Sequence, residues 1–261
     1  MTRSQLILVF SSAILVVLLY QLPRSVVEND QLQEVTKTES HSMEVPQEVE
    51  SQLAELRRLV GEEESVDKKA NFAHALARRF LDYGIIDSAV YYASKIQSWN
   101  AEPSDLAADI YYTAYERSAN PDQAKVNALK AREALQSLLD KDPGNLFLKN
   151  RLAMTLVVSD NPMAGINMLR EVLAADETNR QAILSLGLLA IQSGQFDRAK
   201  ERFEKLVSMN TADHEAKLYL AVSLMEINNQ EQARLLLEEI MTAQDSIPAI
   251  KMMANDYLKS L

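Results

Sequence analysis

Two kinds of hydrophobic pattern divide the chain into an N-terminal apolar run and a long region of helical periodicity. The run covers residues 6–22, LILVFSSAILVVLLYQL, and contains no charged side chain. A helix over this range is about 25 Å long, slightly less than the roughly 30 Å thickness of a bilayer core. Arg3 and Arg24 flank the run and can extend toward the two interfaces. We therefore expect residues 1–24 to be an N-terminal transmembrane anchor.

A cleaved signal peptide is the alternative interpretation of this run. Cleavage needs small residues one and three positions before the cut, and the residues that follow, Pro23 to Val27, offer no such site. The very short tail before the run is typical of anchors whose tail stays in the cytoplasm, although the flanking positive charges barely discriminate between orientations. We expect a single-pass protein of the bacterial inner membrane with its body in the periplasm.

Residues 25–46 show neither a period of 2 nor a period of 3.6 and are mostly polar. The wider stretch 25–67 holds twelve acidic residues against Lys37, Arg57 and Arg58, a charge of −9 out of −10 for the whole chain. Like charges keep such a segment solvated and extended. We expect 25–46 to be a disordered acidic tether, with a docking strip for a basic partner as the alternative.

Beyond the tether, apolar residues recur at spacings of three and four, the period of an amphipathic helix. In residues 47–60 the face is formed by Val49, Leu53, Leu56 and Val60. We expect this helix to pack on the first of the units described below; a short coiled coil between two copies and folding back into the array are the alternatives. The later prolines all fall between periodic segments, where helices begin and end: Pro103, Pro121, Pro143, Pro162 and Pro248.

A second pattern repeats every 34 residues in the C-terminal half of the chain. Small residues recur at two positions of each unit, and large apolar residues follow the second of them by four and seven positions. The matching residues are Leu152, Ala153, Asp160, Gly165, Leu169 and Val172; Leu186, Gly187, Gly194, Ala199, Phe203 and Leu206; and Leu220, Ala221, Asn228, Ala233, Leu237 and Ile240. Antiparallel helices cross closely only where a side chain is small, and large neighbours fill the groove around the crossing. The pattern predicts stacked helix pairs, because one pair cannot bury its apolar face alone.

This spacing resembles the tetratricopeptide repeat, a 34-residue helix–turn–helix unit. The resemblance implies an all-α fold, a right-handed α-solenoid of stacked repeats over residues 47–261. The units are expected at about 70–103, 104–145, 146–179, 180–213 and 214–247, with a capping helix at 248–261. In the unit 104–145, nineteen residues separate Ala124 from Pro143 where the pattern expects twelve, so its second helix is expected to be seven residues longer.

In this family the first helix of each unit lines a concave groove. Carried onto this chain, the groove positions of the last three units are largely apolar, and an exposed apolar strip marks a binding surface. The residues expected to bind a partner are Met154, Val157, Leu184, Leu188, Ile191, Leu218, Val222 and Met225. The partner would be another protein that offers a helical or apolar segment, or a membrane complex. The alternatives are that these residues are covered within the chain or by a second copy.

The groove positions of the first two units carry polar side chains instead. They are His74, Arg78, Asp109, Thr113, Glu116 and Arg117. Because their charges are of both signs, the pattern favours a solvated face here.

Composition narrows the function further. A net charge of −10 argues against a nucleic-acid partner, which needs clustered basic residues. The chain has no Cys, no glycine-rich phosphate loop and no motif of a hydrolase or zinc protease, so we expect no enzyme activity, no cofactor and no metal. The sequence predicts a membrane-anchored scaffold that recruits or holds another protein. The alternative is a structural homo-oligomer formed through the groove or the 47–60 helix.

Overall fold

The computed structural model of the chain describes residues 47–100 and 102–261. The anchor expected at 6–22 and the tether expected at 25–46 lie outside the described residues. Among the described residues, no helix combines the length and the apolar character that crossing a bilayer requires.

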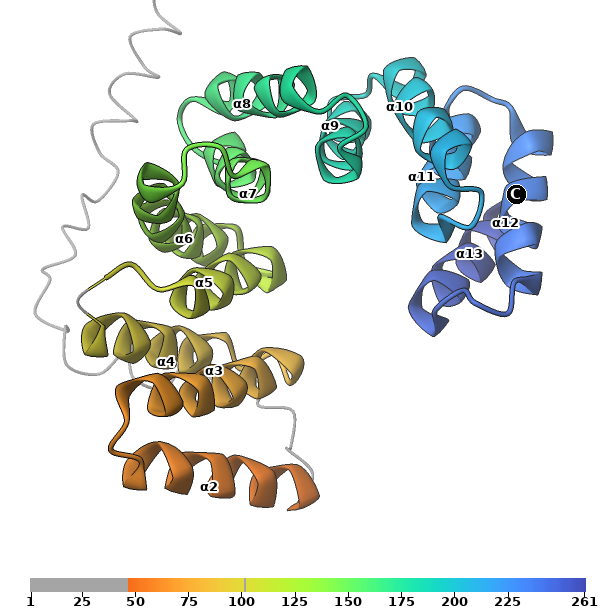
Figure 1. Ribbon diagram of the computed structural model, residues 1–261. Coiled ribbons are helices and arrows are strands. Elements are labelled where there is room, and N and C mark those ends of the chain that lie inside the picture. The colour runs from red at the N-terminus through yellow and green to blue at the C-terminus, as the bar shows by residue number, and fades with distance from the viewer. Residues whose placement is uncertain (1–46, 101) are drawn as a thin grey trace, which may run out of the picture. The chain divides into compact units, whose positions relative to one another are not determined.

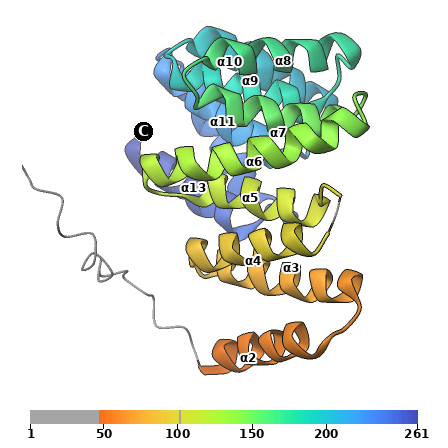
Figure 2. The same ribbon diagram turned by 90° about the vertical axis from the view of Figure 1, so that its left-hand side faces the viewer.

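The described residues form helices and no strands (Figure 1). The helices are α2 (Gln47–Glu62), α3 (Val66–Asp82), α4 (Ile86–Trp99), α5 (Asp105–Arg117), α6 (Pro121–Lys141), α7 (Leu146–Val157), α8 (Pro162–Ala175), α9 (Arg180–Gln192), α10 (Phe196–Met209), α11 (His214–Glu226), α12 (Gln230–Thr242) and α13 (Pro248–Ser260). From α3 to α12 they pack as five consecutive pairs, and each pair also contacts the next. Figure 2 shows α2 to α6 lying one above the other in chain order. An all-helical fold of stacked pairs is therefore confirmed for this part of the chain.

The same local devices begin and turn the helices in successive pairs. Asn145, Asn179 and Asp213, 34 residues apart, each accept a backbone N–H with their side chains at the start of α7, α9 and α11. The turns of three pairs need a left-handed backbone, which Gly84 adopts with φ 70°, Gly194 with φ 71° and Asn228 with φ 62°. Asparagine is one of the few residues besides glycine that tolerate this region. The sequence repeat is therefore also a repeat of caps and turns.

Small residues stand where paired helices cross, as the sequence predicts. A Cβ atom on Gly187 would lie 2.6 Å from the Phe203 ring, and one on Gly165 would lie 2.4 Å from the Ala153 carbonyl oxygen. Phe203 is fully buried in this contact. The close approach of α9 to α10 and of α7 to α8 thus depends on the missing side chains.

The helix α6 has 21 residues, whereas α4, α8 and α10 have 14 each, so the predicted seven-residue extension is confirmed. The helix α2 packs on α3 and buries Val49, Leu53 and Val60, so the expected packing of this segment on the first pair is also confirmed. At the other end, α13 packs on α11 and α12 and buries Ala254.

The apolar core has three parts along the array. One cluster joins α2 to α7, another joins α9 to α13, and a small cluster of Ala153, Leu169 and Leu186 lies between them on α7, α8 and α9. The first helices α3, α5, α7, α9 and α11, called here the first-helix row, carry the groove positions of the sequence. In Figure 1, α7 and α9 lie on the inner side of the bend and α8 and α10 on its outer side.

Candidate functional site

The eight apolar groove residues divide by burial into two groups. Leu184 and Leu218 are 5% and 0% exposed, and Asn150, at the same place in the preceding repeat, is 1% exposed. This repeat position is therefore part of the core, and Leu184 and Leu218 offer nothing to a partner. The other six residues are half-buried and form what we call the apolar strip: Met154, Val157, Leu188, Ile191, Val222 and Met225.

The apolar strip occupies two repeat positions on three successive first helices. Met154, Leu188 and Val222 are 34 residues apart, and the residues three positions after each complete the strip. Leu188, Ile191 and Met225 pack partly against the C-terminal core cluster and remain partly exposed. The strip is thus anchored by the fold and still accessible along α7, α9 and α11.

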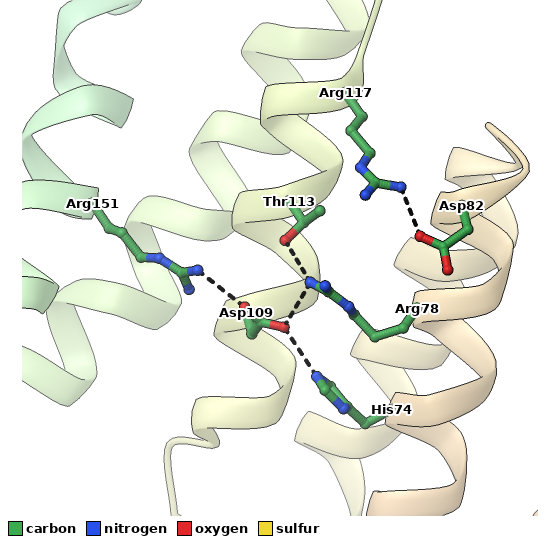
Figure 3. A network of polar contacts seen from close by, with 7 residues as sticks. All are labelled: His74, Arg78, Asp82, Asp109, Thr113, Arg117 and Arg151. Carbon is green, nitrogen blue, oxygen red and sulfur yellow. Dashed lines mark hydrogen bonds and ion pairs between the residues drawn. The ribbon is translucent and has the colours of Figure 1, made fainter. Parts of the chain in front are cut away.

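The other end of the first-helix row carries a polar network (Figure 3). Its centre is Asp109 on α5, whose Oδ2 lies 3.0 Å from Nε2 of His74 and 3.4 Å from Nη1 of Arg78, both on α3. Its Oδ1 accepts a hydrogen bond of 3.1 Å from Arg151 on α7. Arg78 also donates to Oγ1 of Thr113, at 3.4 Å. We call these five residues the Asp109 network.

One carboxylate thus receives donors from two neighbouring helices. An ionised carboxylate only accepts hydrogen bonds, so His74 donates through Nε2. The hydrogen bond from His74, together with those from Arg151 and the positive charges of Arg151 and Arg78, lowers the pKa of Asp109 to about 2, against the opposing effect of burial. The network therefore links α3, α5 and α7 with Asp109 ionised at neutral pH.

An exposed aromatic ring stands beside this network. The guanidinium carbon of Arg151 lies 4.7 Å from the centroid of the Tyr112 ring and 4.6 Å from that of Phe147. Phe147 is 59% exposed. Together with His74, Asp109 and Arg151 it lines a cavity of about 360 Å³. The cavity offers a partner both an aromatic face and polar groups.

The prediction of a solvated face is wrong at the centre of this polar set. His74 and Asp109 keep only 25% and 26% of their side chains exposed, and Thr113 is buried. Glu116 and Arg117 are exposed, as expected, and Arg117 pairs with Asp82 at 3.1 Å.

Arg151 is the functional candidate that the sequence reasoning missed. The contacts of His74 with Asp109 and of Arg78 with Thr113 join residues 35 positions apart, and the contact from Asp109 to Arg151 joins residues 42 apart. The difference is the seven-residue extension of α6. Adding that extension to the repeat spacing would have found Arg151.

Comparison with known proteins finds one family whose sequence model matches part of the chain. Residues 190–255 match the sequence model of the tetratricopeptide repeat. Residues 190–255 therefore carry the sequence signature of the tetratricopeptide repeat. No curated protein sequence matches it significantly.

Two solved tetratricopeptide repeat proteins share the fold. One, from Parabacteroides merdae, is 16% identical with a TM-score of 0.55, over 81% of this chain and 82% of that chain. The other, a thermophilic protein of Thermus thermophilus, is 15% identical with a TM-score of 0.54, over 73% of this chain and 99% of that chain. Both likenesses concern the fold, an array of stacked helix pairs in which each pair contacts its neighbours. Within the part of the chain that the structure describes, no group of three or more acidic or histidine side chains could hold a metal ion.

Proposed function

We propose that this tetratricopeptide repeat protein is a non-enzymatic, membrane-anchored scaffold that holds another protein on its first-helix row. The observation that carries the proposal is the apolar strip, six half-buried residues at two positions of three successive repeats. A surface of this kind, continuous over three helices, fits an apolar or amphipathic segment of a partner better than a small molecule. Met154 and Met225 add adaptable side chains to it.

The anchoring half of the proposal rests on the sequence. A transmembrane helix within residues 6–22 and an acidic tether over 25–46 would hold a right-handed stack of repeats at a membrane, in bacteria on the periplasmic side. Confinement to a membrane raises the effective concentration of the scaffold for partners in the same bilayer. We expect these partners to be membrane proteins or subunits of a membrane complex.

Photo-crosslinking in intact cells of the source organism tests the proposal. A crosslinking amino acid replaces Leu188 or Met225 in the full-length protein, and the adducts are identified by mass spectrometry. The same substitution at Leu235 is the control, because this residue is 60% exposed but lies on the second helix α12. We expect one other polypeptide to crosslink from Leu188 and Met225 and not from Leu235.

Adducts within the chain alone, or between copies of the chain, would contradict the proposal. The second result would support the structural homo-oligomer instead. Fractionation of the same cells tests the anchor: the full-length protein should sediment with membranes, and a variant that lacks residues 1–24 should not.

A further inference from the structure

A second hollow lies where the second helices α8 and α10 meet α9. It has a volume of about 250 Å³. Apolar side chains line part of it, among them Met163, Ile166 and Leu189, and its other lining includes Arg170, Arg198 and Arg202. This hollow, which we call the arginine pocket, lies beside the small core cluster that separates the two larger ones.

The three arginines of the pocket lie together without an ion pair, whereas the other described arginines that lack one, Arg79, Arg132 and Arg234, lie on different helices. Among the described residues, none of the three has a carboxylate within ion-pair distance, whereas six other arginines are paired: Arg57, Arg58, Arg78, Arg117, Arg151 and Arg180. The hydrogen bonds of the three pocket arginines go to neutral oxygens. Arg170 donates to Asn167 at 3.2 Å, Arg198 to the Gln195 side chain at 2.5 Å, and Arg202 to the Arg198 carbonyl at 3.0 Å.

The positive charges of the three arginines act on one another within the pocket. Burial lowers the pKa of Arg202, and the positive charges of Arg198 and Arg170 lower it further, while the carboxylate of Glu201 acts in the opposite direction. The chain has a net charge of −10, yet among the described residues the nearby acid Glu201 forms no ion pair with Arg202, and no other carboxylate pairs with the three arginines. Repulsion that is kept at a specific place is typical of a binding site, where the ligand supplies the opposite charge.

The lining defines the chemistry of that ligand. Guanidinium groups bind carboxylates through paired N–H donors. Inorganic phosphate would leave Met163, Ile166 and Leu189 uncovered, and an anionic bilayer is flat and repels a strongly acidic chain. A peptide segment that carries Glu or Asp next to a large apolar residue satisfies both halves of the lining.

We propose that the arginine pocket binds an acidic segment of a partner protein, with carboxylates on Arg170, Arg198 and Arg202 and a neighbouring apolar side chain against Met163, Ile166 and Leu189. This assigns a second binding surface, lined by α8, α9 and α10. The scaffold then holds two protein segments at once, one by apolar contact and one by charge.

Fluorescence anisotropy with the full-length protein in a neutral detergent at low salt tests the proposal. The probe is the fluorescein-labelled peptide Gly-Glu-Glu-Leu-Glu-Glu-Leu-Gly. Two matched peptides replace either all Glu by Gln or both Leu by Ser. We expect the probe to bind and each matched peptide to bind at least about tenfold more weakly, because one loses the charge-assisted hydrogen bonds to the arginines and the other loses the apolar contact.

Variants of the protein locate the site. The double variant R198Q/R202Q should weaken binding of the probe by about tenfold or more and, because repulsion is relieved, should melt at the same or a higher temperature. R234Q is the matched control, because Arg234 is an exposed arginine of α12 without an ion pair among the described residues. It should leave the affinity unchanged.

Failure of the probe to bind, or equal binding by the wild type and R198Q/R202Q, would overturn the proposal. Phosphatidylglycerol vesicles and pyrophosphate are tested in the same way. If either binds in an arginine-dependent way while the probe does not, the proposal is overturned in favour of a lipid or phosphate site. Crosslinking from Leu188 in R198Q/R202Q separates the two proposals: its persistence shows that loss at the arginine pocket leaves the apolar strip working.

Discussion

The two ends of the first-helix row carry different kinds of side chain. On α3, α5 and α7 they are the polar residues of the Asp109 network, in which one carboxylate receives two arginines and a histidine. On α7, α9 and α11 they are the residues of the apolar strip. Both ends are built from helix pairs, with α6 seven residues longer than α8 and α10, so the contrast lies mainly in the side chains.

This difference separates two ways of joining one repeat to the next. Apolar packing depends on shape and volume and responds little to pH or salt. A network of charges depends on geometry and ionisation, and it fixes which side chains can face one another. We infer that the C-terminal half offers an adaptable surface, whereas the N-terminal half offers a rigid one with an exposed Phe147 at its edge.

The largest effect is expected from a substitution that breaks the packing of the C-terminal half. Phe203 is fully buried against Gly187, so Phe203→Ala leaves a cavity that the rigid helix crossing cannot close. We expect the free energy of unfolding to fall by about 3–5 kcal/mol. Urea denaturation followed by far-UV circular dichroism measures it. Leu235→Ala is the control, since an exposed side chain should change the stability by about 0.5 kcal/mol or less; equal losses in both variants would mean that the crossing is loosely packed.

The sequence predicted what the repeat itself determines. Helix pairs, small crossing residues such as Gly187 and the extension of α6 follow from spacing, because caps, turns and crossings recur with the repeat. Burial at a single groove position did not follow: Leu184 and Leu218 belong to the core, since successive first helices contact one another there. The sequence named four residues of the Asp109 network as a polar set. It missed Arg151 and the pairing, because these contacts join three helices and a shift of one residue decides which side chains meet.

A smaller effect, dependent on pH, is expected from the Asp109 network. Folding lowers the pKa of Asp109 from 3.8 to about 2, so the ionised carboxylate stabilises the fold above pH 4 and this contribution is lost as the pH falls toward 2. Asp109→Asn should therefore cost about 1–2 kcal/mol at pH 7, and the difference from the wild type should shrink below pH 4. Urea denaturation at pH 7, 4 and 3 measures this change.

Asp160→Asn serves as the matched control for this series. Asp160 is exposed in the turn between α7 and α8 and has no ion pair among the described residues. The substitution Asp160→Asn should leave both the free energy of unfolding and its pH dependence close to those of the wild type. A pH-independent loss in Asp109→Asn would mean that the carboxylate acts by shape rather than by charge, and the contrast between the two halves would then disappear.

The smallest effect is expected where the two halves meet, at the contact of Arg151 with Phe147 on α7. The guanidinium group lies over the ring at 4.6 Å, and a partly exposed contact of this kind contributes about 0.5–1 kcal/mol. A double-mutant cycle with Arg151→Gln and Phe147→Ala isolates it, because the bond from Arg151 to Asp109 is lost in both arms and cancels. The coupling should persist at high salt, unlike that of Arg151 with Asp109. A coupling energy of zero between Arg151 and Phe147 would mean that the network does not hold the Phe147 ring in place. The exposed ring would then offer a partner a mobile contact rather than a rigid one.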